Sequence, residues 1–279
     1  MTETKKSDTV WPYDFVLDGT HTLDENIESQ RNHILRIRKR RELFFDPLIT
    51  SGFLRGKRIL DLGSSAGYWG LMAITEGQAE FVQAVDALPT AVEKAKDVFA
   101  SYGVADHRYN ICLADAYQFL EAHHADYDVI LCLGFLYHVR DPYRLIKLMH
   151  EAAREIVVID TLVHNTEEAL ISVRPVRRKT ELVQDSALSL ELHASPKALY
   201  WMANEAGFKV VRSLSANFEQ VGWCWDYWAK ERRAFVLSKI GDVSSIYPAR
   251  YDEGFLTPSE DLDRYGIYPE MKPRGRQSA

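Results

Sequence analysis

The sequence predicts an α/β fold built on a doubly wound, seven-stranded and mostly parallel sheet. Short apolar runs that suit buried strands alternate with helical patterns from residue 57 to residue 206. In addition, the first of these strands runs into a glycine-rich turn that leads to a helix. Alternation at this spacing is typical of parallel strands joined by right-handed helical crossovers.

Each predicted element has a local signal. Pro89 suits the first turn of one helix, whereas Ser195, Pro196 and Gly207 mark the N-cap, first residue and end of another. The expected strands are 57–62, 81–86, 108–114, 127–134, 155–160, 208–213 and 234–239. The expected core helices are 67–77, 90–102, 116–122, 142–153 and 196–206.

Three segments lie outside this alternation. The chain from Leu23 to Ile49 has an apolar stripe at helical spacing, with a break expected near Pro47. Later in the chain, a polar stretch interrupts the strands and is predicted to be an inserted cap, and the C-terminal segment is rich in proline, tyrosine and charge. The predicted parts are an N-terminal helical arm at 1–50, a core domain at 51–241 with the cap near 162–194, and a tail at 242–279.

The composition excludes several classes of protein. A net charge of −6 argues against a nucleic-acid substrate. No apolar run is long enough for a transmembrane helix and the polar N-terminus lacks the core of a signal peptide, so we expect a cytoplasmic protein without membrane contact. Cys112, Cys132 and Cys224 lie in apolar or aromatic stretches, and no CxxC pair is present. Reduced thiols and no zinc site are therefore predicted.

Residues 58–70 give the strongest functional signal. They read as a buried strand that reaches Asp61, turns through Gly63 and Gly67 and enters a helix. The next strand ends in Asp86, an acid placed to bind both hydroxyls of a ribose. This pattern predicts a nucleoside cofactor at the carboxyl end of the parallel strands.

The spacing D-x-G-x-x-x-G from Asp61 to Gly67 resembles the first motif of class I, Rossmann-like methyltransferases that use S-adenosylmethionine (SAM). The resemblance implies that the turn faces the methionine part of SAM, with Asp61 orienting the turn or reaching the ammonium. It also implies that Asp86 binds the ribose, Asp115 the adenine amine, and that the methyl group lies beside Gly134. The cofactor-binding residues expected on this basis are Asp61, Gly63, Ser64, Gly67, Asp86, Ala87, Asp115, Ala116, Leu133 and Gly134.

Two other interpretations compete with this one. Acids after strands can merely cap turns, although three of them in order at successive strand ends are hard to explain in this way. A dehydrogenase is the main rival for the same fold, but the chain lacks the G-x-G-x-x-G pattern at this turn.

Methyl transfer to a hydroxyl requires a group that removes the acceptor's proton. Residues 134–142 leave the fourth strand at the methyl position and contain Tyr137 and His138. An imidazole with an ordinary pKa of about 6.5 can act as a base at neutral pH, so His138 is the predicted catalytic residue. The alternative is a histidine that orders the loop through a backbone hydrogen bond.

The end of the fifth strand offers further polar groups. Asp160 and His164 are expected to face the cleft and to bind substrate, or, with Glu191, a divalent cation that polarises a sugar diol. A helix or loop cap is the simpler alternative. His193 and Glu181 in the insertion can also reach the cleft, but their direction is not fixed by the sequence.

Residues 133–142, Leu-Gly-Phe-Leu-Tyr-His-Val-Arg-Asp-Pro, carry a narrower resemblance. They are similar to the loop of the tRNA uridine-34 carboxymethyltransferase group, which has a Tyr-His pair and a basic-x-Pro turn here. The similarity covers residues 40–165. That group uses carboxy-SAM, whose carboxylate needs a cationic partner that the sequence does not identify.

Two features point to different acceptors. Trp223 and Trp225 can stack on a sugar or ring system and are predicted, with Tyr137, to bind substrate, while Asp226 can bond a hydroxyl. The alternative for each tryptophan is packing against the sheet.

Basic segments at 31–41 and 174–179 can instead track RNA phosphates, or form solvated helix faces. Because the chain is acidic overall, we predict a SAM-dependent O-methyltransferase that acts on a hydroxyl of a small molecule, such as a sugar or a glycosylated natural product. The alternatives are a tRNA wobble-uridine (carboxy)methyltransferase and a non-catalytic SAM-binding protein. The oligomeric state stays open, with a homodimer among the options.

Overall fold

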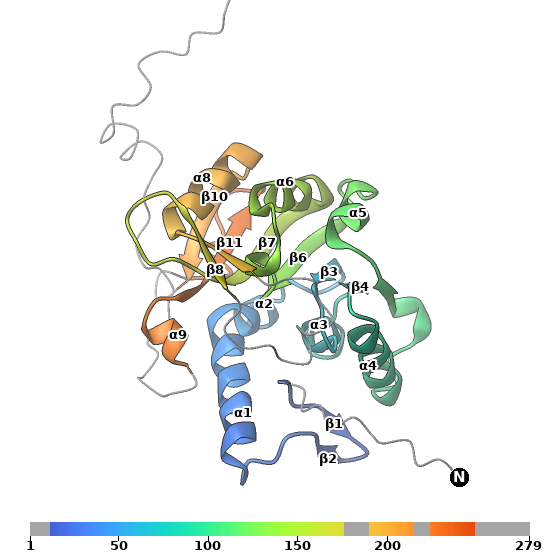
Figure 1. Ribbon diagram of the computed structural model, residues 1–279. Helices are drawn as coiled ribbons and strands as arrows, with labels where there is room; N and C mark the ends of the chain where they lie inside the picture. The colour runs from blue at the N-terminus through green and yellow to red at the C-terminus, as the bar shows by residue number, and fades with distance from the viewer. Residues whose placement is uncertain (1–11, 176–189, 215–223, 249–279) are drawn as a thin grey trace, which may run out of the picture.

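Figure 1 shows the computed structural model, which describes residues 12–175, 190–214 and 224–248. The central sheet consists of β3 Arg58–Leu62, β4 Phe81–Asp86, β5 Tyr109–Leu113, β6 Tyr127–Leu133, β7 Ala153–Leu162, β10 Val210–Leu214 and β11 Arg232–Ser238. Its seven strands follow the order β10-β11-β7-β6-β3-β4-β5. Strands β3 to β7 are parallel, whereas β11 is antiparallel to β7 and β10. This topology confirms the predicted doubly wound, mostly parallel sheet.

Helices cover both faces of the sheet. They are α3 Tyr68–Thr75, α4 Pro89–Ser101, α5 Ala116–Glu121, α6 Pro142–Ala152 and α8 Pro196–Ala206. Because side chains alternate along a strand, Leu60 and Ile130 enter the core under α5, α6 and α8, whereas Ile59 and Leu131 enter the core under α3 and α4. Figure 1 shows α6 and α8 side by side over one half of the sheet.

The N-terminal arm is helical but is not one continuous helix. Its segments are α1 Glu28–Arg40, the π-helical turn η1 Arg41–Phe45 and α2 Asp46–Thr50. The arm is thus interrupted just before Pro47, near the predicted break, and Pro47 itself lies in the first turn of α2. Phe44 and Phe45 are the last two residues of this π-helical turn, and both are fully buried.

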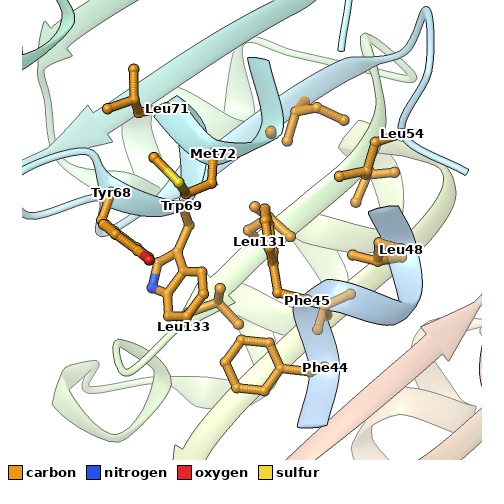
Figure 2. Close-up of a cluster of buried hydrophobic side chains, with 14 of the residues drawn as sticks. Phe44, Phe45, Leu48, Leu54, Tyr68, Trp69, Leu71, Met72, Leu131 and Leu133 are labelled. Carbon is orange, nitrogen blue, oxygen red and sulfur yellow. The ribbon is translucent and has the colours of Figure 1, made fainter. Parts of the chain in front are cut away.

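Trp69, near the start of α3, joins the arm to the sheet. The centroid of its ring lies 5.3 Å from that of Phe44 and 5.2 Å from that of Phe45. Figure 2 shows these rings together with Leu131 and Leu133 of β6 in one apolar cluster. The arm is thus packed beside the carboxyl end of β6.

The N-terminal segment docks on this cluster. After Tyr13, strands β1 (Val16–Leu17) and β2 (Thr20–His21) form a short antiparallel hairpin. Tyr13 is buried and stacks on Tyr68, with 5.1 Å between ring centroids. Trp11 lies outside the described residues.

The predicted insertion contains an antiparallel pair, β8 (Ile171–Pro175) and β9 (Leu190–Ala194). The chain between these strands lies outside the described residues. Strand β9 contacts η3 (Leu136–His138), the helical turn that follows β6. Within the described ranges, no helix has the length and apolar character needed to cross a membrane.

Candidate functional site

The glycine turn after β3 bends through left-handed backbone conformations. Gly63 and Gly67 have φ angles of 70° and 76°, and Ser65 between them has 50°. The amides of Gly63 and Ser64 donate to the carbonyl oxygen of Val85 at 2.9 and 3.0 Å, which ties the turn to β4. Gly67 is the N-cap of α3, so the first amides of that helix face the turn.

The turn has no room for a side chain at Gly63 but holds unsatisfied hydroxyls. A Cβ at Gly63 would lie 2.6 Å from Cγ of Phe135, so the phenyl ring rests on the glycine. The Oγ atoms of Ser64 and Ser65 are buried and have no hydrogen-bond partner among the described residues. Buried polar atoms normally have partners, so a polar ligand suits this turn. The residues fit the methionine end of SAM.

Asp61 lies beneath the turn. It is 1% exposed, and its Oδ2 accepts a 2.9 Å hydrogen bond from the amide of Gly70. Burial, helped by the charge of Asp86, raises the pKa of Asp61 to about 7. Asp61 therefore orients the start of α3, and its charge at neutral pH depends on what lies nearby.

The acids at the ends of β4 and β5 also accept backbone hydrogen bonds. Asp86 accepts from the amide of Ser65 at 2.8 Å and from the amide two residues after itself at 2.9 Å. Asp115 is the N-cap of α5, where one carboxylate oxygen accepts two amides at 2.9 and 3.1 Å. Asp86 is half-buried and Asp115 is exposed; Ala87 is also exposed, whereas Ala116 is buried. Both acids thus cap backbone amides, and because β4 pairs with β5 they lie on one edge of the sheet.

The end of β6 is flanked by two guanidinium groups. Leu133 is buried, and Gly134 follows it with a φ angle of 89° and donates its amide to the carbonyl oxygen of Asp160 at 2.7 Å. A Cβ at Gly134 would have Nη2 of Arg40 at 3.8 Å and Nη1 of Arg232 at 3.9 Å as its nearest neighbours. The predicted methyl position therefore lies beside positive charge.

Asp160 is engaged by these cations and does not act as a free ligand. Its Oδ2 accepts from Arg40 at 2.8 Å and from Arg232 at 3.1 Å, and its Oδ1 accepts the hydroxyl of Tyr227 at 2.7 Å. The side chain is fully buried. Both carboxylate oxygens therefore already have partners within the fold, and direct binding of an acceptor by Asp160 stays a prediction.

Asp226, offered by the sequence as a hydroxyl ligand, belongs to the same network. It accepts from Arg36 at 2.8 Å and from Arg232 at 2.9 Å, and Figure 1 shows its helix, α9 (Trp225–Trp228), beside α1. Although burial alone would raise it, the pKa of Asp226 is held at about 2 by Arg36 and Arg232. Together with Arg40 and Asp160, the network has three guanidinium groups and two carboxylates, an excess of one positive charge.

The turn after β6 places two histidines around Tyr137. The centroid of the Tyr137 ring lies 4.1 Å from that of His138 and 6.1 Å from that of His193 on β9. The Nε2 atom of His193 is 3.0 Å from Oε2 of Glu191. The hydroxyl of Tyr137 accepts a 3.2 Å hydrogen bond from Arg232.

His138, the predicted base, is uncharged at neutral pH. Burial lowers its pKa to about 4; Glu191 opposes this shift, while the charge of Arg232 adds to it. The side chain is half-buried on the turn, one residue after Tyr137. A neutral imidazole has the lone pair that a base requires, although a pKa this low makes it a weak proton acceptor.

Two further predicted substrate residues, His164 and Trp225, lie within the described residues, and the amide of His164 donates to the carbonyl oxygen of Ala194, next to His193. His164 is half-buried, and its Nδ1 is 3.0 Å from Nη2 of Arg174. Trp225 is 46% exposed at the start of α9. Trp223 and Glu181 lie outside the described residues.

A cation site of Asp160, His164 and Glu191 was one alternative for these residues, and the structure does not assemble it. Within residues 12–175, 190–214 and 224–248, no group of three or more histidine, cysteine, aspartate or glutamate side chains is arranged to hold a metal ion. All three cysteines are free thiols.

Sequence reasoning missed the buried arginines of the site. The sequence groups Arg40 with a basic helix face, and Arg232 precedes the strand expected at 234–239. Each of these arginines lies next to an apolar run, which indicates that it can be buried. A buried arginine is rarely without a carboxylate partner, so this pattern could have prompted a search for one. The partner itself, Asp160, was expected to be open to substrate.

Comparison with known proteins agrees with this geometry. Residues 29–213 match the model of a family described as a methyltransferase domain. The chain is 26% identical over 121 residues to the tRNA U34 carboxymethyltransferase of Helicobacter hepaticus, which covers 42% of this chain but only 38% of that protein. It is 26% identical over 199 residues to the ubiquinone biosynthesis O-methyltransferase of Neisseria meningitidis serogroup C, covering 71% of this chain and 78% of that protein.

Solved structures share the fold. The N-terminal domain of EvdMO1 with SAH bound gives a TM-score of 0.59 at 16% identity, covering 82% of this chain and 91% of that chain. Magnesium protoporphyrin IX methyltransferase from Synechocystis PCC 6803 with bound SAM gives 0.50 at 13% identity, covering 76% and 81%. Because the family model spans more than half of the sequence, the chain belongs to the methyltransferase domain family, and it has the class I, Rossmann-like methyltransferase fold.

Proposed function

We propose that this methyltransferase transfers the methyl group of SAM to a hydroxyl of a small molecule, such as a sugar or a glycosylated natural product. When bound, SAM supplies a methyl group on a positively charged sulfur. The protein has to align the acceptor and take up its proton. The observation that carries the proposal is the pair of imidazoles, His138 and His193, around Tyr137 at the end of β6.

In this proposal, SAM lies along the carboxyl edge of the sheet. The turn from Gly63 to Gly67, with Ser64, holds the methionine end of SAM. Asp86 with Ala87 binds the ribose, and Asp115 with Ala116 binds the adenine. Leu133 and Gly134 line the methyl position. This placement is supported by the left-handed backbone of Gly63 and Gly67, and by the acids that share this edge of the sheet.

In this proposal, the acceptor lies on the side of Gly134 opposite the cofactor. Tyr137 and His138 face it from η3, and the exposed indole of Trp225 can stack on an apolar ring face. His138 is the base that the sequence predicts, and its neutral imidazole can take a proton or accept a hydrogen bond.

A small acceptor is favoured over RNA by the partners of the basic arm. Arg36 and Arg40 of α1 point into the buried network, and Arg38 pairs with Glu25 at 2.7 Å. Cations that track a phosphate backbone have to be free to contact it. The alignment over 71% of this chain with a protein named an O-methyltransferase also supports a hydroxyl acceptor.

The second candidate is (carboxy)methylation of a tRNA wobble uridine. Arg40 and Arg232 lie close to Gly134, where a carboxylate on the transferred group would need a cation. The similarity to a tRNA U34 carboxymethyltransferase covers a minor part of that protein. A third reading, a SAM-binding protein without catalysis, predicts no transfer to any acceptor.

The test is incubation of the protein with methyl-labelled SAM and two fractions of a cell extract, small glycosides and bulk tRNA. Label in the small-molecule fraction, followed by mass spectrometry, supports the proposal and identifies the acceptor. Label in tRNA supports the second candidate. Cofactor binding without transfer, with binding lost in Asp86→Ala, supports the third.

A further inference from the structure

Glu191, which is half-buried, and His193, which is buried, form a pair that has no catalytic role in the proposed function. They lie two positions apart on β9, so their side chains leave the same face of the hairpin. Oε2 of Glu191 and Nε2 of His193 are 3.0 Å apart, and the side chains are 16% and 6% exposed. The hydrogen bond with His193 lowers the pKa of Glu191 against the effect of burial. Glu191 is therefore ionised at neutral pH.

This contact fixes the tautomer of neutral His193. An ionised carboxylate only accepts hydrogen bonds, so Nε2 carries the hydrogen and donates it to Glu191. The lone pair of the imidazole is then on Nδ1. That atom is buried and has no partner among the residues that the structure describes. A buried acceptor without a donor is destabilising. A ligand whose O–H group donates a hydrogen bond to Nδ1 would remove this cost.

Tyr137 connects this pair to the methyl position. Its ring meets that of His193 edge-on, with an interplanar angle of 77°. Its hydroxyl accepts from Nη2 of Arg232, whose Nη1 lies 3.9 Å from the place of a Cβ on Gly134. The imidazole of His193 is thus one side chain away from the guanidinium beside Gly134.

We propose that His193, oriented by Glu191, is the general base of the methyl transfer; this inference rests on the proposed hydroxyl acceptor. As the acceptor oxygen bonds to the methyl carbon, the carbon–sulfur bond breaks and its electron pair stays on sulfur. The acceptor's proton passes to Nδ1 of His193. Glu191 stabilises the imidazolium that forms, as an orienting carboxylate does for a catalytic histidine in other enzymes, and the proton is later lost to water.

His138 is less suited to this step than His193. Glu191 contacts His193 directly but acts on His138 only through space. Burial also makes His138 a weak proton acceptor, with a pKa of about 4. We assign His138 to positioning, because its ring packs on that of Tyr137, with 4.1 Å between centroids.

The experiment compares variants in the transfer of labelled methyl from SAM to the small-molecule fraction of a cell extract. We expect His193→Gln to lower kcat by about 100-fold or more without changing KM or SAH affinity. Glu191→Gln removes the negative charge and is expected to lower kcat by about 10-fold. Added imidazole is expected to restore activity to His193→Gly. His123→Gln is the matched control, since His123 stacks on Phe119 away from the turn after β6.

Several outcomes would overturn the inference. A structural role for His193 predicts that activity falls only with the folded fraction, measured by thermal unfolding, and that imidazole restores nothing. If His193→Gly does not fold, His193→Gln and Glu191→Gln carry the test. Turnover that persists in His193→Gln but is lost in His138→Gln leaves hydroxyl methylation standing and rejects His193 as the base. Absence of transfer by the parent protein rejects both proposals.

Discussion

Nη2 of Arg40 donates a 2.8 Å hydrogen bond to Oδ2 of Asp160, although the two residues are 120 positions apart in the chain. Both side chains are buried, so this ion pair ties the N-terminal arm to β7. Asp160 also neutralises Arg232. The pair therefore holds the arm against the sheet edge on which the predicted methyl position lies.

Asp160→Asn is expected to destabilise the protein strongly, because it leaves Arg40 buried without a carboxylate and removes one of the two carboxylates that pair with Arg232. The expected loss in the free energy of unfolding is about 3–5 kcal/mol, measured by urea denaturation. Glu25→Gln is the control, since the pair between Glu25 and Arg38 is 63% exposed on both sides. The control is expected to cost no more than about 1 kcal/mol. Equal effects for the two variants would contradict a buried charge network.

Gly63→Ala tests the packing of the glycine turn. Gly103 is the matched control, because it has a similar φ angle, 64° against 70°, but open space where a Cβ would stand. Gly103→Ala is expected to cost about 1–2 kcal/mol of unfolding free energy from backbone strain alone. Gly63→Ala is expected to cost a further 1–3 kcal/mol or so, since its Cβ overlaps the ring of Phe135. Phe135→Ala in the same chain should recover part of this excess; no recovery would locate the strain elsewhere.

Asp86→Asn tests the ribose site. Loss of a charged acceptor is expected to weaken SAH binding by roughly 10-fold to 100-fold, measured by titration calorimetry. Asp106→Asn, in the helical turn η2 (Asp106–Arg108), is the control and should leave SAH affinity unchanged. Circular dichroism would verify that both variants are folded. Unchanged SAH affinity in Asp86→Asn would contradict a ribose-binding role, and Asp86 would then only accept hydrogen bonds from backbone amides.

Asp61 is expected to make stability fall as pH rises. Its pKa is raised from 3.8 to about 7 in the folded protein, so the folded state binds more protons than the unfolded state between these values. The free energy of unfolding then decreases with pH in this window, by at most about 1.4 kcal/mol per pH unit. Asp61→Asn removes this contribution, and its difference from the parent should grow from about pH 4 to 7. The lowered pKa of His138 makes the free energy of unfolding rise with pH below about 6.5. This effect is the same in the parent and in Asp61→Asn, so it does not contribute to the difference between them.

The pH dependence of turnover tests His138. If His138 accepts the proton, kcat/KM is expected to fall only as the pH approaches about 4, where this imidazole becomes charged. An acid limb at clearly higher pH, measured with the labelled acceptor, would exclude His138 as the base. The same profile in His138→Gln would show whether that limb belongs to another group.

Local patterns predicted much of this protein. The apolar runs indicated the strands. The signals at Ser195 and Gly207 marked the ends of α8 where the structure has them, and α4 begins at Pro89, one residue before the predicted start. The glycine turn and the acids at the ends of β3 and β4 were also predicted, because a parallel strand that ends in such a turn has few other geometries. These features depend on residues that are neighbours in the chain.

The sequence by itself therefore determined the sheet and the order of its strands and helices along the chain, and it predicted the cofactor edge, since backbone preference and apolar period are local properties. Only the tertiary structure decided that Arg40 and Arg232 are buried on Asp160, and that His193 of the insertion reaches Tyr137. The physical reason is that a charge can be buried only where a distant partner compensates its desolvation, and that partner is fixed by how the arm and the hairpin pack on the sheet.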